Sequence, residues 1–137
     1  MRVTASSRAA SLEAVYESLH QLLSRYSPPL KTKTGTVRGK KDFHLMIPKA
    51  VVVPGVYESK PAEVGLAAII LQKGYGGFYF MPIYIEPALK KKLPPPLAKL
   101  LQGKTCFHIK KLDDDLLKHI ETALDEGVEN YKRRGWL

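Results

Sequence analysis

Cysteine and long hydrophobic runs are the scarcest features of this 137-residue chain. The one cysteine, Cys106, excludes a disulfide within the chain and a cysteine-rich zinc site. The longest apolar run, from Val64 to Leu71, is far shorter than the roughly 20 residues that span a bilayer. No apolar stretch typical of a signal peptide follows residues 1–8. We therefore expect a cytoplasmic protein without membrane association.

Catalytic signatures are also lacking. The sequence contains no Gly-x-Ser-x-Gly, no His-Glu-x-x-His and no dinucleotide-binding fingerprint. The glycine-rich segment 74–77 lacks the Gly-Lys-Ser/Thr ending of a phosphate-binding loop, so we interpret it as a turn. Because no motif favours catalysis, we expect a non-enzymatic binding protein.

Acidic residues are few compared with basic ones. Asp and Glu number 13 against 22 Lys and Arg, which gives a formal net charge of +9. Such an excess attracts anions, among them nucleic acids and phosphorylated ligands. It is also compatible with solubility alone. The rest of the composition, 45% hydrophobic and 26% charged, is that of an ordinary globular protein. We expect a single domain over residues 1–137, with 1–6 disordered.

The two ends of the sequence predict amphipathic helices. Apolar residues recur at helical spacing over 11–26, with Ser11 as the N-cap and Ser27-Pro28-Pro29 as the end. The last helix follows Asp113, which can cap it, and Gly135 comes directly after its basic end. Both helices have one apolar stripe, which predicts that each packs on another layer.

Between these helices the sequence predicts strands. Apolar and aromatic runs at 64–71 and 78–84 flank the turn at 73–77, which is typical of a β-hairpin. We predict shorter strands at 34–37, 43–47, 49–53 and 104–111. Helical pieces are expected over 86–102, interrupted by the prolines at 94–96. This order predicts an α+β fold with N- and C-terminal helices packed on a mainly antiparallel sheet.

The second half of the chain resembles a bacterial family. Four segments show the resemblance. They are the predicted aromatic strand 78–84 with its Met81-Pro82 pair, the run 96–111 around Cys106-Phe107, the acidic start of the last helix at 113–114 and its basic end at 131–136. In this order they are similar to the YdhG-like family of unknown function, over a little under half of the chain. The resemblance implies a frataxin-like fold. One relative is described as an intracellular iron chaperone, so it also implies iron handling, with iron or iron-using proteins as partners.

Frataxin-type proteins bind iron through carboxylates along an acidic face, and both terminal helices offer candidates. The last helix carries Asp115, Glu126, Glu129 and His119 on the side opposite its apolar stripe, and the first carries Glu13, Glu17 and His20. Clustered oxygen ligands with an imidazole suit hard cations, so these residues are the predicted metal ligands. The alternative is that both sets are solvated helix faces.

The basic residues support an alternative function. Tyr75, Tyr79 or Tyr84 beside a cationic patch would suit single-stranded nucleic acid or a phosphorylated ligand. Because lysine supplies a point charge, such binding should be salt-sensitive and indifferent to sequence. The candidate anion-binding residues are Lys31, Lys33, Arg38, Lys40, Lys41, Lys104 and Lys110.

Cys106 and His108 form the last candidate site. Residues two apart on a strand share a face, so Phe107 and Ile109 should point to the core and this pair away from it. A thiolate beside cations has a lowered pKa and becomes nucleophilic, which makes the pair a candidate reactive site. The alternative is a packed cysteine beside an exposed histidine.

Overall fold

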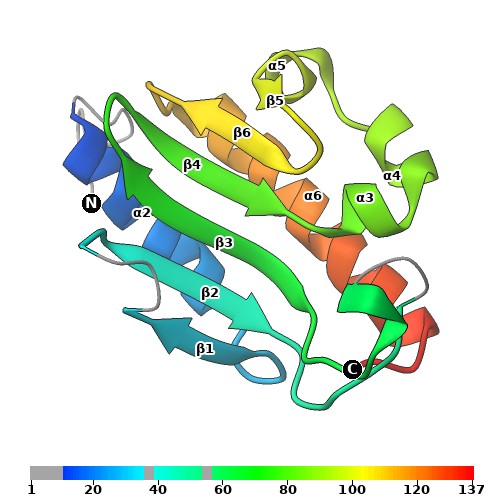
Figure 1. Ribbon diagram of the computed structural model, residues 1–137. Coiled ribbons are helices and arrows are strands. Elements are labelled where there is room, and N and C mark those ends of the chain that lie inside the picture. Colours follow the sequence, from blue (N-terminus) through cyan, green and yellow to red (C-terminus); the bar gives the residue numbers. More distant parts are fainter. Residues whose placement is uncertain (1–10, 36–38, 54–56) are drawn as a thin grey trace.

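An antiparallel sheet forms one layer of the protein, and helices form the other (Figure 1). The computed structural model describes residues 11–35, 39–53 and 57–137. The strand order is β1-β2-β3-β4-β6-β5, and every neighbouring pair is antiparallel. The strands are β1 (Lys31–Thr34), β2 (Asp42–Met46), β3 (Gly65–Gln72), β4 (Tyr75–Phe80), β5 (Leu101–Gln102) and β6 (Cys106–Ile109).

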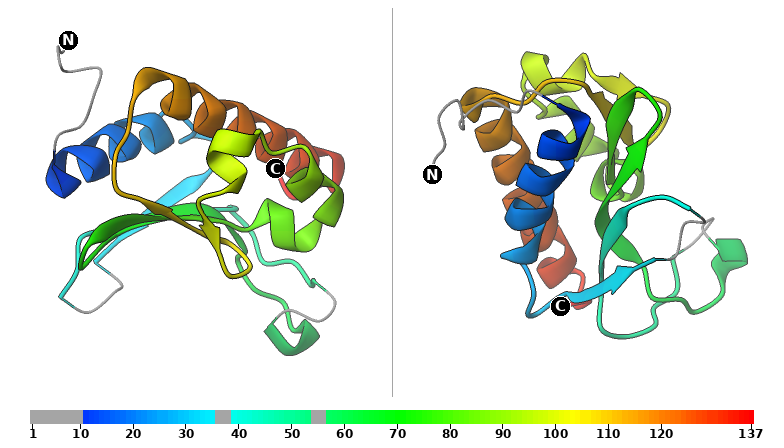
Figure 2. Two further views of the ribbon diagram at one scale, coloured as in Figure 1. Left: turned by 90° about the horizontal axis from the view of Figure 1, so that it is seen from above. Right: turned by 90° about the vertical axis from the view of Figure 1, so that its left-hand side faces the viewer.

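The two long helices cover the same face of this sheet (Figure 2). They are α2 (Leu12–Ser24) and α6 (Asp114–Arg133). The shorter helices are α3 (Pro82–Ile85), α4 (Pro87–Lys91), α5 (Pro95–Ala98) and the 3-10 turn η1 (Tyr57–Ser59). This arrangement confirms the predicted α+β fold with terminal helices packed on an antiparallel sheet. The expected disorder of residues 1–6 lies outside the described residues. No helix in the described ranges is long and apolar enough to cross a membrane.

Both long helices begin and end where the sequence predicts. The Ser11 hydroxyl accepts a hydrogen bond from the Ala14 amide at 3.2 Å, and the Asp113 carboxylate accepts one from the Leu116 amide at 2.8 Å. These caps satisfy amides that have no partner inside a first helical turn. Beyond α6, Gly135 takes a φ of +78°, the left-handed conformation that ends many helices.

The core lies between the sheet and the two long helices. Alternate residues of each strand point into it, as the period of two in a strand requires. Three buried rings from two strands pack there: the ring centroid of Phe78 lies 5.8 Å from that of Phe80 and 5.6 Å from that of Phe107. The helices contribute the apolar residues of their inner faces. The fully buried residues of the whole core, from helices and strands, include Val15, Leu19, Leu23, Leu45, Leu66, Ile69, Ile109, Ile120, Leu124 and Tyr131.

The strand prediction is right for the central sheet and wrong at several edges. The hairpin of β3 and β4 turns on Lys73 and Gly74 alone, with Gly74 at a φ of +94°, so the next two glycines belong to β4. The run 49–53 forms a single bridge from Val51 to Ala62 and no strand. The predicted strand at 34–37 falls partly outside the described residues, and the strand described there, β1, ends at Thr34.

The proline-rich region also differs from the prediction. Pro95 and Pro96 open α5, a position where the missing amide hydrogen costs nothing. The chain then enters the short strand β5, which pairs with β6, although the sequence predicts helix there. The predicted strand at 104–111 shortens to β6, because a turn precedes it and the α6 cap follows it.

Candidate functional site

One face of the sheet points away from the helices, and we call it the open face. The long helices α2 and α6 lie on the other side, and the 3-10 turn η1 lies on this side beyond the start of β3 (Figure 2). The strand pairing fixes which side chains share it, because directly paired residues point the same way. Its members are half-buried or exposed, apart from Asp42 and Gly77, which are buried. They are Lys31, Lys33, Asp42, His44, Met46, Ala68, Ile70, Gln72, Tyr75, Gly77, Tyr79, Gln102, Cys106 and His108.

A stacked ring pair lies toward one end of the open face. Tyr75 begins β4 and His108 lies on the neighbouring strand β6, with their ring centroids 3.7 Å apart and their planes at 13°. Gly77 on β4 is the direct partner of His108 on β6. Because Gly77 has no side chain, it places no β-carbon beside the two rings. The pair presents a half-buried aromatic surface to solvent.

A third ring, Tyr79, lies on β4, the strand of Tyr75. Its ring covers Gly77: a β-carbon at that glycine would come within 2.9 Å of the Tyr79 Cε1 atom. The Tyr79 hydroxyl accepts a hydrogen bond from the Gln72 side-chain amide at 3.0 Å, which fixes the direction of the ring. Burial raises the phenol pKa above its usual value, so the hydroxyl stays protonated at neutral pH. The open face therefore carries two aromatic positions held by their neighbours.

Cys106 lies beside Tyr79 on the adjacent strand. Burial raises the pKa of its thiol, and a hydrogen bond with the Tyr79 hydroxyl offsets part of that rise. Phe107 and Ile109 are fully buried, so the predicted alternation of β6 is correct. His108 stacks on Tyr75, so each member of the predicted pair has a different neighbour. A thiol with a raised pKa is the opposite of an activated nucleophile, so this environment does not favour the predicted thiolate activation.

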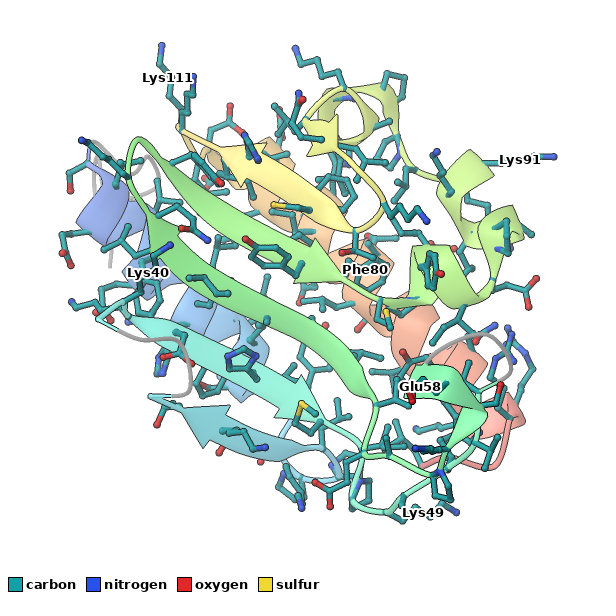
Figure 3. The ribbon with its side chains drawn as sticks, viewed as in Figure 1. Lys40, Lys49, Glu58, Phe80, Lys91 and Lys111 are labelled. Atoms are coloured by element: carbon teal, nitrogen blue, oxygen red, sulfur yellow. The ribbon has the colours of Figure 1, made fainter. Side chains whose placement is uncertain are left out.

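The candidate lysines surround the open face on three sides without forming one patch. Lys33 lies on β1 opposite His44, and Lys31 on the same strand pairs with Glu63 at 2.6 Å. At the end near the β3–β4 turn, Lys40 donates to the Gln72 side chain. Figure 3 places Lys40 and Lys111 at this end of the sheet.

The other candidate cations lie elsewhere. Lys110 follows β6, at the hairpin end of the sheet. Lys104 belongs to the turn between β5 and β6, at the opposite end of the sheet, with its ammonium 5.4 Å from the centre of the Tyr84 ring. Lys41 faces the helix layer, where it bonds Glu13, so its prediction as part of the same patch is wrong. Arg38 lies outside the described residues.

The metal ligands predicted on the first helix have other partners. Glu13 and Glu17 both face the Lys41 ammonium, at 2.8 and 3.8 Å. His20 packs against Phe43, with ring centroids 4.3 Å apart. These three side chains do lie on one side of α2, as the spacing predicts, but a lysine occupies the position between the two carboxylates where a cation would bind.

The ligands predicted on α6 divide into two places. Asp115 and His119 line a groove at the start of the helix, and Glu126 and Glu129 line a separate hollow beside Arg133. Asp115 and Glu126 are 11 residues apart, which is about 16 Å along a helix. In the described ranges, no three His, Cys, Asp or Glu side chains gather as a metal ion requires. The prediction of one ligand set on this helix is therefore wrong.

Asp42 is a buried charged residue of the open face that no sequence motif indicates. Its carboxylate is almost fully buried, accepts a hydrogen bond from the Gly35 amide at 2.8 Å and pairs with His44 Nε2 at 2.8 Å. These contacts join β1 to β2 and place the carboxylate beneath the open face. The alternation of β2 could have assigned Asp42 to this face, but its burial and its bond to the Gly35 amide depend on contacts outside the strand pattern.

Comparison of the chain with protein-family models, with curated proteins and with solved structures finds no significant match.

Proposed function

We propose that this chain is a non-enzymatic binding protein whose open face binds single-stranded nucleic acid. The observation that carries the proposal is the pair of aromatic positions, Tyr75 with His108 and Tyr79, on adjacent strands of a sheet face that no described helix covers. Stacking of a base on an aromatic side chain contributes about 1–3 kcal/mol and tolerates any base. Rings displayed on antiparallel strands are a known way of stacking unpaired bases.

The charges around the face favour a nucleic-acid strand over an uncharged ligand. Lys33, Lys40 and Lys110 lie at its margins, where the phosphates of a strand crossing the rings would pass. The acid within the face, Asp42, is buried and already bonded, so it adds little repulsion at the surface. Lysines attract phosphates without reading bases, so we expect low sequence preference and strong salt dependence.

Iron handling, the function implied by the resemblance to the YdhG-like family, has less support. The carboxylates on α2 are paired with Lys41, and those on α6 lie at two separate places. Frataxin-type binding needs carboxylates gathered on one face, so we place the nucleic-acid proposal first and keep iron as the alternative.

Fluorescence anisotropy with a labelled oligothymidylate of about 15 nucleotides tests the proposal. We expect saturable binding that weakens with salt, by a log–log slope of about −0.7 for each phosphate neutralised. Tyr79→Leu should weaken binding about fivefold or more because the ring is lost, whereas Tyr79→Phe should bind like the parent because the ring remains. A duplex of the same length should bind more weakly, since its bases cannot stack on the sheet.

A second pair of variants separates the open face from general positive charge. Lys33→Gln with Lys40→Gln removes two cations at the open face, and Lys118→Gln with Lys132→Gln removes two exposed cations from α6 on the helix side. The first pair should weaken binding and reduce the salt slope more than the second. Equal losses from both pairs, or equal affinity of Tyr79→Leu and Tyr79→Phe, would reject the open face as the binding surface.

A further inference from the structure

A groove lies at the edge of the sheet beside the open face, and His108 borders both of them. It has a volume of about 680 Å³ and lies between the segment that follows α5, the end of β6 and the first turns of α6. Small-molecule sites commonly have volumes of about 300–1,000 Å³, so the groove is large enough for a compact organic ligand. Asp115 and His119, two of the predicted metal ligands, line this groove, and so does Lys110 from the margin of the open face.

The groove has a cationic part and an apolar part. Lys99 approaches from the α5 side, and Lys110 and Lys111 from the end of β6. Three lysine side chains that line one hollow suit an anion with more than one charge, such as a phosphomonoester, which carries about −1.5 to −2 at neutral pH. Leu100 and Leu116 add apolar surface that a phosphate alone would leave unused.

The α6 side of the groove has a different chemistry. Asp115 and His119 are one helical turn apart and both line it. Asp113 also lines it, but its carboxylate already accepts the Leu116 amide as the helix cap. A carboxylate here repels a second anionic group and accepts hydrogen bonds from an amino group. The ligand that fits therefore has a phosphate at one end and a hydrogen-bond donor at the other.

We propose that this groove binds a nucleoside monophosphate with an amino-bearing base. The phosphate contacts Lys99, Lys110 and Lys111, the base lies against Leu100 and Leu116, and its exocyclic amino group donates to Asp115. The inference does not rest on nucleic-acid binding at the open face, because Tyr75 and Tyr79 do not line the groove. His108 and Lys110 line the groove and also border the open face.

Amide chemical-shift mapping of the full chain with adenosine 5′-monophosphate tests this site directly. We expect saturable shifts at residues 99–100, 110–111 and 115–119. Inorganic phosphate and adenosine, each of which supplies half of the ligand, should bind at least about tenfold more weakly. Inosine 5′-monophosphate lacks the amino group and should also bind more weakly than the adenosine compound.

Two double variants provide the control. Lys99→Gln with Lys111→Gln should weaken adenosine 5′-monophosphate binding by about tenfold or more, while Lys90→Gln with Lys91→Gln should not change it. Figure 3 shows Lys91 and Lys111 at different ends of the molecule, and the residues of the control pair do not line the groove. The spectra also report whether each variant is folded. Absence of saturable shifts, shifts centred on Tyr75 and Tyr79, or equal binding of inorganic phosphate would overturn the assignment.

Discussion

The ring of Tyr79 lies over Gly77, in space that the side chain of any other residue would occupy. A β-carbon at Gly77 would come within 2.9 Å of the Tyr79 Cε1 atom and 3.2 Å of its hydroxyl oxygen. The two residues are two positions apart on β4 and so point to the same face. The absence of a side chain at Gly77 allows the ring to extend along the strand toward Gln72, where its hydroxyl is bonded.

Gly77→Ala should therefore displace the Tyr79 ring. Because that ring is half-buried and borders solvent, it can rotate away, so we expect a modest loss of unfolding free energy, about 1 kcal/mol. The affinity for the labelled oligothymidylate should fall about fivefold or more, since the stacking surface moves. Anisotropy and urea denaturation measure the two effects. Unchanged affinity in a folded variant would mean that the position of the ring over Gly77 does not matter for binding.

Cys106 should react slowly with alkylating reagents at neutral pH. Burial raises its thiol pKa above the usual value, so less thiolate is present than in an exposed cysteine. The rate with iodoacetamide should rise steadily as pH increases through and beyond the usual thiol pKa. Tyr79→Phe removes a hydrogen bond that lowers this pKa, so the variant should react more slowly still at a given pH.

The unfolded chain in urea is the control for this measurement, because its thiol should react at an ordinary rate. A fast reaction that is already constant below pH 7 would show an activated thiolate and restore the prediction of a reactive Cys106 and His108 pair.

The sequence predicts the architecture better than the site, for physical reasons. Helix caps such as Ser11 and Asp113 act within a few residues, so local pattern locates α2 and α6. Alternation on β6 likewise places Phe107 in the core. The positions of the lysines relative to one another depend on pairing between strands that are distant in the sequence. Lys41 lies opposite Leu71 and turns to the helix layer. Its neighbour Lys40 lies on the other face and donates to the Gln72 side chain.

The predicted metal ligands do not gather in the described residues, for a related reason. Helical spacing shows which side of a helix a residue takes, but it does not show what the helix packs against. Glu13 and Glu17 share a side of α2, and Lys41 from another element binds there. The resemblance to the YdhG-like family stays a prediction, because neither the fold nor the comparisons identify the family.

Asp42 should contribute more to the free energy of unfolding than an exposed acid such as Asp114. Asp42→Ala removes the hydrogen bonds of this buried carboxylate to the Gly35 amide and the His44 ring, each of which contributes about 1 kcal/mol. Asp114→Ala removes an exposed carboxylate from the first turn of α6, where the favourable dipole interaction contributes about 0.3–1 kcal/mol. Urea denaturation should show the larger loss for Asp42→Ala. Equal losses would mean that the contacts of Asp42 add nothing to the stability of the β1–β2 pair.

Gly127→Ala should destabilise the protein although alanine is the better helix former. Gly127 lies inside α6, where alanine would favour the helix by about 1 kcal/mol. A β-carbon there would lie 2.9 Å from both Phe80 Cζ and Pro82 Cγ, and both of these residues are buried and cannot move aside. Overpacking of this kind costs about 1–3 kcal/mol, so the packing penalty should exceed the gain in helix propensity.

Thr122→Ala provides the matched control, since Thr122 is exposed on the same helix and its change gains helix propensity without a new contact. We expect Thr122→Ala to raise the unfolding free energy by about 0.5 kcal/mol, and Gly127→Ala to lower it. If Gly127→Ala were stabilising, α6 could move away from Phe80 at little cost, and the contact between the helix and the end of β4 would be looser than its geometry indicates.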